Sequence, residues 1–277
     1  MIQDREGLQR DAGRLVEALL RTDSARHVQS ITIKGALRLN KKITMYSPLR
    51  CMYNPSIYPG HRFKRSGLDE ILEDEEPVDA GGDFVVYDEG VIQDSSEEDM
   101  AWVPFVNLLG ATTGLKDLVY DCRSQLPPSL LRALHEQLPS CRLHHLTFRF
   151  RTLLWGVPYH YEMELATSPC LYRVKVVCTD KDSDGDFDYN MDAVRELAAG
   201  LAPSLKEVSI NKLWPYRHSV GKPLWQGLPG FSGEMIGSLT SLSLYGSGSI
   251  QKWAKNTDFD KLQQLVIGFR LSGEEME

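Results

Sequence analysis

The chain lacks several features that would assign it to a function class. Its 277 residues include only five cysteines, and no two of them have the C-x-x-C spacing of zinc and redox sites. No run approaches the roughly 20 apolar residues that cross a bilayer, and no apolar stretch follows the first Met. We therefore expect no membrane segment and no secretory signal. Unpaired thiols favour an intracellular protein, cytoplasmic or nuclear.

Catalytic motifs are also missing. Neither H-E-x-x-H, G-x-S-x-G nor a G-K-[ST] phosphate loop occurs. His144 and His145 are adjacent on an expected strand, so their rings point to opposite faces and do not readily bind one zinc ion. We expect no enzyme and no cofactor. The alternative of another class is an α/β hydrolase or a metal-dependent enzyme, which a closed pocket with converging carboxylates or histidines would indicate.

Each of two neighbouring segments lacks charged residues of one sign. Residues 24–68 contain nine Lys and Arg and no acid, whereas residues 69–115 contain fourteen Asp and Glu and no base. Most of the net charge of -7 comes from this block, and residues 34–99 read as an irregular charged insertion. A chain without a broad basic face is not expected to bind nucleic acid.

What the chain does contain is a repeat. The pattern apolar, two variable, apolar, one variable, apolar recurs seven times, and each copy ends in the alternation of a half-buried strand. The copies are Val28–Ile33, Leu115–Tyr120, Leu143–Phe148, Leu171–Val176, Leu205–Ile210, Leu239–Leu244 and Leu262–Ile267.

Helix-like stretches separate these copies. Leu130, Leu131 and Leu134 share one helical face, and the apolar run Met100–Leu109 reads as the helix that restarts the repeat after the insertion. The sequence predicts an α/β fold, a leucine-rich-repeat-like solenoid with a parallel concave sheet and outer helices. We expect one domain over 1–277, with the main repeat array at 100–271. A conventional α/β domain is the alternative.

The amino-acid sequences of three of these stretches resemble a known family. The stretches LPPSLLRALHEQLPSCRLHHLTFRFRTL (126–153), ELATSPCLYRVKV (164–176) and LAAGLAPSLKEVSI (197–210) are similar to the leucine-rich repeats of filamentous-fungal F-box-like proteins. In that family an F-box docks on the adaptor of a cullin-type ubiquitin ligase while the repeats present a substrate. No F-box is recognisable before Val28. The resemblance implies a non-catalytic protein-binding module, and the alternative it leaves open is a ubiquitin-ligase substrate adaptor whose F-box is missing from this chain.

Strand positions between the apolar residues supply the candidate binding surface. If the second and third apolar residues of each copy face the core, the residues beside them face out. Arg149, Arg173 and Lys175 would then lie together and suit an acidic peptide segment of a protein partner. The candidate partner-binding residues are Asp117, Asp121, His145, Arg149, Arg173, Lys175, Glu207, Asn211 and Tyr245.

One loop resembles half of a calcium site. Asp180, Asp182 and Asp184 stand at positions 1, 3 and 5 of an EF-hand-like loop, with Gly185 at position 6, and Asp186 follows. Position 12 holds Met191 in place of the bidentate Glu. We therefore expect a solvated turn rather than a metal site, with these four aspartates as the weak calcium candidate.

Overall fold

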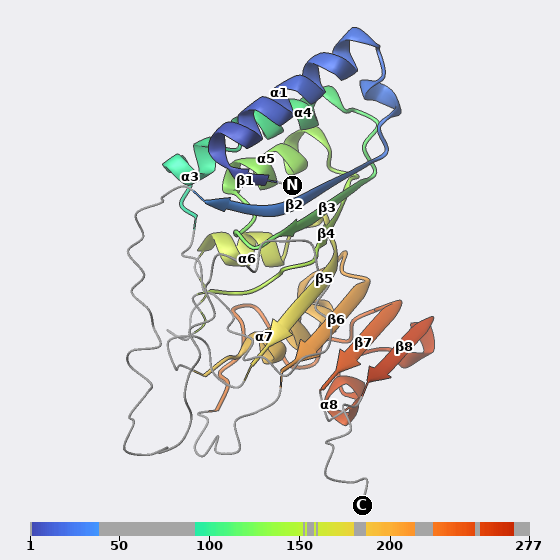
Figure 1. The fold of residues 1–277 in the computed structure, drawn as a ribbon. Helices are drawn as coiled ribbons and strands as arrows, with labels where there is room; N and C mark the ends of the chain where they lie inside the picture. The colour runs from blue at the N-terminus through green and yellow to red at the C-terminus, as the bar shows by residue number, and fades with distance from the viewer. Residues whose placement is uncertain are drawn as a thin grey trace, which may run out of the picture.

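The structure is a computed structural model that describes residues 2–38, 92–151, 153, 158, 160–179, 187–213, 224–246 and 250–268. Figure 1 shows a layer of strands with helices packed against it. Among the described residues, no helix has both the length and the apolarity needed to cross a bilayer.

Helices and strands alternate along most of the chain. The α-helices described before β5 are α1 (Arg5–Arg21), α3 (Glu97–Met100), α4 (Val103–Ala111), α5 (Pro128–Gln137) and α6 (His160–Ala166). α7 (Asn190–Glu196), the π-helical turn η3 (Leu197–Leu201) and α8 (Ile250–Ala254) follow, and the short 3-10 turns are η1 (Ala25–His27) and η4 (Phe259–Lys261). The strands are β1 (Ile2–Asp4), β2 (Ser30–Arg38), β3 (Asp117–Cys122), β4 (Arg142–His145), β5 (Leu171–Cys178), β6 (Glu207–Lys212), β7 (Ser241–Tyr245) and β8 (Gln264–Gly268).

The described strands form one open sheet in the order of the sequence, β1 to β8, and all neighbouring strands pair in parallel. The α/β class and the parallel sheet are therefore confirmed. The expected register holds for most of the sheet: Ile31 of β2 pairs with Leu118 of β3, and Val208, Leu242 and Leu265 pair in turn. The single-domain assignment stays a prediction.

β4 is the exception to the expected register. Leu143, rather than Leu146, pairs with Leu118, so this strand is shifted by three residues and ends at His145. Beyond β4 the backbone crosses between its neighbours: the N–H of Leu146 donates to the Tyr120 carbonyl, and that of Phe148 donates to the Lys175 carbonyl. The pattern L-x-x-L-x-L therefore does not run along a single strand in this copy.

Helices cover one face of the sheet. In β3 the residues Leu118, Tyr120 and Cys122 have no exposed surface, whereas Val119 and Asp121 between them are half-buried. The same alternation recurs in β6 and β7. Strand residues alternate between faces, so the residues between the buried ones lie on the second face, where they are only half-buried or exposed among the described residues.

The helix layer follows from apolar spacing and helix-start residues. Leu130, Leu131 and Leu134 of α5 are fully buried, as the sequence predicts, and Pro128 occupies the first turn, where its missing N–H costs nothing. Helices α1, α4 and α5 contact one another in chain order (Figure 1). The expected helix Met100–Leu109 is instead two short helices, with Pro104 in the first turn of the second.

The connection from β6 to β7 differs from the expected unit, because its described residues contain no α-helix. A close backbone contact fixes this segment: a Cβ at Gly237 would collide with the carbonyl oxygen of Ala198, at the end of the preceding helix. Glycine is therefore required where the two backbones meet. Most of the charged insertion lies outside the described residues.

Candidate interaction surface on the open face of the sheet

The open face is the set of outward-pointing strand residues on the side of the sheet away from the helices. From β3 onward most of them are polar or charged and lie half-buried or exposed between neighbouring strands. They are Asp117, Val119, Asp121, His144, Arg173, Lys175, Val177, Glu207, Ser209, Asn211, Ser241, Ser243, Tyr245, Gln264 and Val266.

A bulge between β4 and β5 builds the most ordered part of this face. Leu143 pairs with Leu171, but His144 pairs with Arg173, so Tyr172 is an extra residue without a partner on β4. Bulges of this kind re-aim side chains and are common beside functional sites. Here the bulge places Tyr172 against both Arg142 and His144, with its ring centroid 5.5 Å from that of His144.

Asp117 ties this cluster together. Its Oδ1 lies 2.9 Å from His144 Nε2 and 2.8 Å from Arg142 Nε, and Arg142 Nη2 donates to Oδ2 at 2.8 Å. The guanidinium carbon of Arg142 lies 5.2 Å from the centroid of Tyr172, within cation–π range. Burial alone would raise the pKa of Asp117, but the hydrogen bonds from Arg142 and His144 outweigh it and lower that pKa below its ordinary value. We call Asp117, Arg142, His144 and Tyr172 the Asp117 cluster.

Contacts continue along the same row of the open face. Arg173 Nε lies 3.5 Å from Glu207 Oε2, and Ser241 Oγ donates to Gln264 Oε1 at 3.0 Å. The Lys175 side chain is exposed, with no ion-pair partner among the residues that the structure describes. The row is therefore a preformed chain of polar contacts in which most charges are already compensated.

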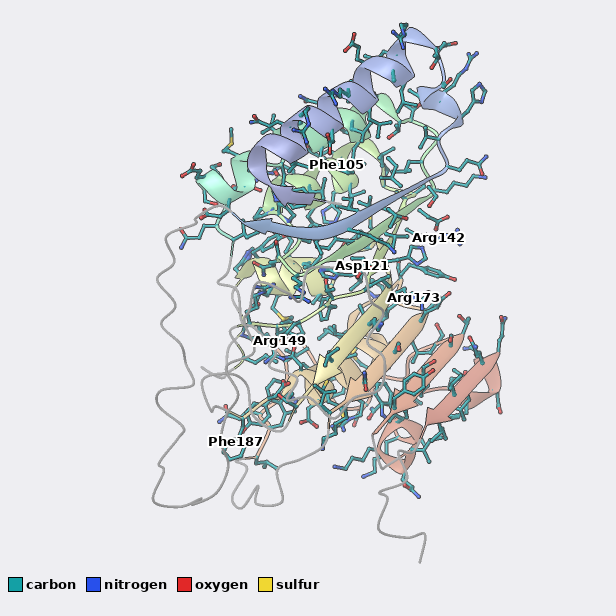
Figure 2. All side chains as sticks on the ribbon, in the orientation of Figure 1. Phe105, Asp121, Arg142, Arg149, Arg173 and Phe187 are labelled. Carbon is teal, nitrogen blue, oxygen red and sulfur yellow. The ribbon has the colours of Figure 1, made fainter. Side chains whose placement is uncertain are left out.

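Two predicted positions on this face are wrong. His145 is only 2% exposed, because the shifted register of β4 places it beside Tyr120 on the core side, where its ring packs against Tyr120 and Phe148. Burial lowers the pKa of His145 to about 3, so its imidazole is neutral. Arg149 lies beyond the end of β4, and Figure 2 shows it well away from Arg142 and Arg173.

The structure therefore does not bring Arg149, Arg173 and Lys175 together as a basic patch. Arg149 pairs with a buried carboxylate and Arg173 with Glu207, whereas Lys175 has no acidic partner within the described ranges. Strand pairing does place the remaining predicted residues on the open face. These are Asp117, Asp121, Arg173, Lys175, Glu207, Asn211 and Tyr245.

Three members of the Asp117 cluster, namely Arg142, His144 and Tyr172, were not predicted from the sequence. Arg142 and His144 alternate with Leu143. They could have been predicted on the open face if Leu143 had been taken as the first core residue of the strand. Tyr172 carries no such signal, because its outward position results from the bulge.

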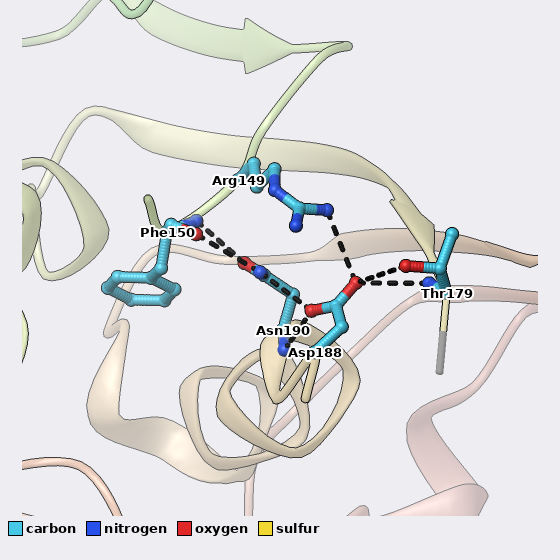
Figure 3. Close-up of polar contacts among 5 residues, drawn as sticks. All are labelled: Arg149, Phe150, Thr179, Asp188 and Asn190. Atoms are coloured by element: carbon cyan, nitrogen blue, oxygen red, sulfur yellow. Dashed lines mark hydrogen bonds and ion pairs between the residues drawn. The ribbon is translucent and has the colours of Figure 1, made fainter. Parts of the chain in front are cut away.

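Arg149 belongs to a buried network at the carboxyl ends of the strands (Figure 3). The Asp188 side chain is fully buried, and its Oδ2 lies 3.2 Å from Arg149 Nη1 and accepts from the backbone N–H of Thr179 at 3.0 Å. Its Oδ1 accepts from both the backbone N–H and the side-chain amide of Asn190, each at 2.9 Å. The Asn190 amide in turn pairs with both backbone groups of Phe150.

This network also holds the start of α7. The Asn190 side chain is engaged with Phe150, and the carboxylate of Asp188, two residues before the helix begins, accepts the backbone N–H of Asn190. The candidate calcium ligands Asp180, Asp182, Asp184 and Asp186 lie outside the described residues. Within the described ranges, no three His, Cys, Asp or Glu side chains form a group that could hold a metal ion.

A hollow of about 250 Å³ lies elsewhere, between α5 and α6, and is lined by Asp94, Pro128, Arg132, His160, Tyr161 and Glu164. Its central polar groups already have partners: Arg132 Nη2 lies 2.8 Å from Asp94 Oδ2, and the Tyr161 hydroxyl donates to the Leu126 carbonyl at 2.5 Å. The Asp94–Arg132 pair and the Tyr161–Leu126 hydrogen bond therefore engage three of the six residues that line the hollow.

Comparisons of the chain with protein-family models, curated proteins and solved structures give no match.

Proposed function

We propose that the chain is a non-catalytic protein-binding module built as a leucine-rich-repeat-like solenoid, and that its partner docks on the open face of the sheet. The observation that carries the proposal is the one-sided cover: helices bury Leu118, Tyr120 and Cys122, while the alternate residues form an uncovered polar surface across consecutive strands. Extended strand surfaces of this kind suit macromolecules better than small ligands, which bind in pockets.

The composition of the Asp117 cluster supports a protein partner. Arg and Tyr are enriched among the residues that dominate binding energy at protein interfaces. Arg142 is held by two contacts to Asp117 and by the ring of Tyr172, so it loses little side-chain freedom when a partner docks. We place the centre of the interface on this cluster, with Lys175 as the adjacent free charge.

The resemblance to F-box-like repeats gives this proposal a more specific form. In that form the open face presents a substrate to a cullin-type ubiquitin ligase, and the docking module belongs to another part of the assembly. Recovery of cullin-ligase subunits together with the partner would favour this form.

Site-specific photo-crosslinking in cells tests the proposal. A photoreactive amino acid at Ser209 or Ser243 of the open face should yield the same discrete crosslinked protein, whereas one at Glu136, exposed on α5, should not. Adding Arg142→Ala and Tyr172→Ala should remove the product while leaving the thermal unfolding midpoint nearly unchanged, since neither residue is in the core. Equal crosslinking from Glu136, or a product that survives the double substitution, would overturn the proposal.

A further inference from the structure

The two edges of the sheet are built differently. β1, at one edge, is three residues long and includes the charged Asp4. β8, at the other, is five residues long, has the sequence QLVIG and carries no charge, no proline and no bulge in its pairing with β7. Proteins usually protect an edge strand by shortening it or charging it, because its free backbone groups pair with other strands. β1 follows this rule and β8 does not.

The core-side residues of β8 are exposed. Leu265 is 42% exposed and Ile267 38%, although their register partners on β7, Leu242 and Leu244, are 0% and 1% exposed. No described strand or helix covers this end of the core, so the apolar layer of the sheet continues to its edge and stops there uncovered.

The outward backbone groups of β8 can be assigned. The N–H of Gln264 donates to Thr240 and the carbonyl of Gly268 accepts from Gly246, so these residues point toward β7. Residues alternate in direction along a strand, and the N–H and C=O groups of Leu265 and Ile267 therefore point away from the sheet. The residues with exposed apolar side chains are also those whose backbone groups have no hydrogen-bond partner in the part of the chain that the structure describes.

We propose that β8 pairs antiparallel with β8 of a second copy of this chain, about a two-fold axis normal to the sheet that passes midway between the two copies of Val266. Leu265 of one copy then lies opposite Ile267 of the other, and each such pair exchanges both backbone hydrogen bonds. An axis normal to the sheet keeps the helix layers of both copies on the same side. The exposed leucine and isoleucine therefore cover each other and join the two cores.

Several features favour a second copy over a different partner. The pattern of β8 is self-complementary about Val266, with an apolar residue opposite each apolar residue. Neither β7 nor β8 contains a charged residue, so two copies approach at this edge without the like-charge repulsion that a net charge of -7 would otherwise cause. A partner of opposite charge would find no charged group to recognise on either strand.

Tyr245 and Gly268 extend the same edge on the open face. A Cβ at Gly268 would collide with the Tyr245 ring, which is 43% exposed and lies over the glycine. The aromatic side chain therefore reaches the outer strand and covers backbone that has no side chain of its own. In the dimer, Gly268 faces Gln264 of the second copy, so the ring lies beside the junction.

Sedimentation velocity of the purified chain tests the association. We expect a monomer at about 1 µM and a dimer at about 300 µM, because an edge-strand contact of this size belongs to the weak, transient class. Ile267→Lys, which places two ammonium groups at the junction, should weaken the dimer at least about tenfold. Ile236→Lys is the matched control, since Ile236 is 68% exposed and belongs to the connection between β6 and β7 rather than to the edge strand. Thermal unfolding of both variants verifies that they are folded.

A disulfide experiment tests the register, in a background with Cys51→Ser. Val266 faces its own symmetry mate in a non-hydrogen-bonded pair, with Cα atoms about 4.5 Å apart, so Val266→Cys should form a covalent dimer under mild oxidation. Gln264→Cys should not, because the two copies of residue 264 are roughly 14 Å apart along the strands. The other described cysteines are buried in the monomer.

The outcomes are decisive in both directions. A chain that stays monomeric at the highest concentration overturns the proposal, as does a dimer that Ile267→Lys leaves intact or that Gln264→Cys crosslinks as readily as Val266→Cys. The proposal does not depend on what binds the open face. Loss of the partner crosslink from Ser209 would leave the dimer untouched, and a monomeric chain would leave the proposed function untouched.

Discussion

The carboxylate of Glu196 accepts a 2.6 Å hydrogen bond from the indole N–H of Trp225, across the segment that joins β6 to β7. Its second oxygen accepts from the backbone N–H of Leu228, also at 2.6 Å. Trp225 in turn stacks on Tyr189, with ring centroids 5.3 Å apart. A single buried acid at the end of α7 thus holds a connection whose described residues contain no helix.

Replacing Glu196 should lower the free energy of unfolding and should remove the part of its pH dependence that comes from this residue. Glu196→Gln keeps one acceptor but turns an N–H group toward a donor, and we expect a loss of about 1–3 kcal/mol in urea unfolding. Burial raises the pKa of Glu196 despite these hydrogen bonds. The folded state therefore binds the proton more tightly than the unfolded state, and this residue's contribution to stability falls as the pH rises through the window between its ordinary and its raised pKa.

The unfolding free energy of the wild type relative to Glu196→Gln, measured from pH 4 to pH 7, isolates that contribution. Glu136→Gln, at an exposed position on α5, is the matched control and should show no such trend. A stability difference that grows as the pH rises would contradict the expected direction.

The buried neutral imidazole of His145 should make the fold acid-sensitive. Its pKa is about 3 in the folded state against about 6.5 when unfolded, so the unfolded chain binds more protons between these values. Its contribution is complete above pH 6.5 and should decline by about 1.4 kcal/mol for each pH unit below it. His145→Phe, which keeps the ring packing against Tyr120 and Phe148, should flatten the stability profile between pH 6.5 and pH 4.5. Parallel profiles for the variant and the wild type would show that His145 does not cause the acid sensitivity.

Breaking the Asp188 network should cost more than removing it. Asp188→Asn leaves the nearly buried Arg149 without its carboxylate and should destabilise the chain by about 3 kcal/mol in urea unfolding. Arg149→Met alone leaves the carboxylate with its donors from Thr179 and Asn190 and should cost less. The double variant should lose less unfolding free energy than the two single variants lose together, and a double-mutant cycle measures this difference. Strict additivity would show that the pair does not couple.

Two glycines should respond to alanine in opposite ways. Gly237→Ala should destabilise by more than about 3 kcal/mol, because its Cβ meets the Ala198 carbonyl and the backbone of one segment must move. Gly13, inside α1, has open space around its Cβ position, so Gly13→Ala should stabilise by up to about 1 kcal/mol. Thermal unfolding of the two variants tests both signs.

Sequence periodicity predicted much of the sheet because apolar residues alternate regularly in β3, β6 and β7: Leu118, Val208, Leu242 and Leu265 are aligned as the repeat predicts. It failed at β4, where two phases of the alternation compete: Leu143 has one phase, and Leu146 and Phe148 have the other. The short length of β4 decides which residues face the core, because the strand ends at His145, whose ring packs against Tyr120.

The candidate surface was predicted only in part, for the same reason. An error of phase in one strand placed His145 on the surface and hid His144 and Arg142. Arg149 could not be assigned from spacing, because its partner Asp188 lies 39 residues away and the contact forms beyond the end of the strand. Lys175 and Glu207 lie on strands with regular pairing and were placed correctly on the sheet.

The order of the strands also determines how local opening should spread. Each strand exchanges backbone hydrogen bonds only with the strands before and after it in the sequence, so no strand is held by a distant part of the chain except across the insertion between β2 and β3. Fraying at β8 therefore exposes β7 next and then β6. Amide hydrogens should exchange in a gradient that rises toward the carboxyl end of the sheet.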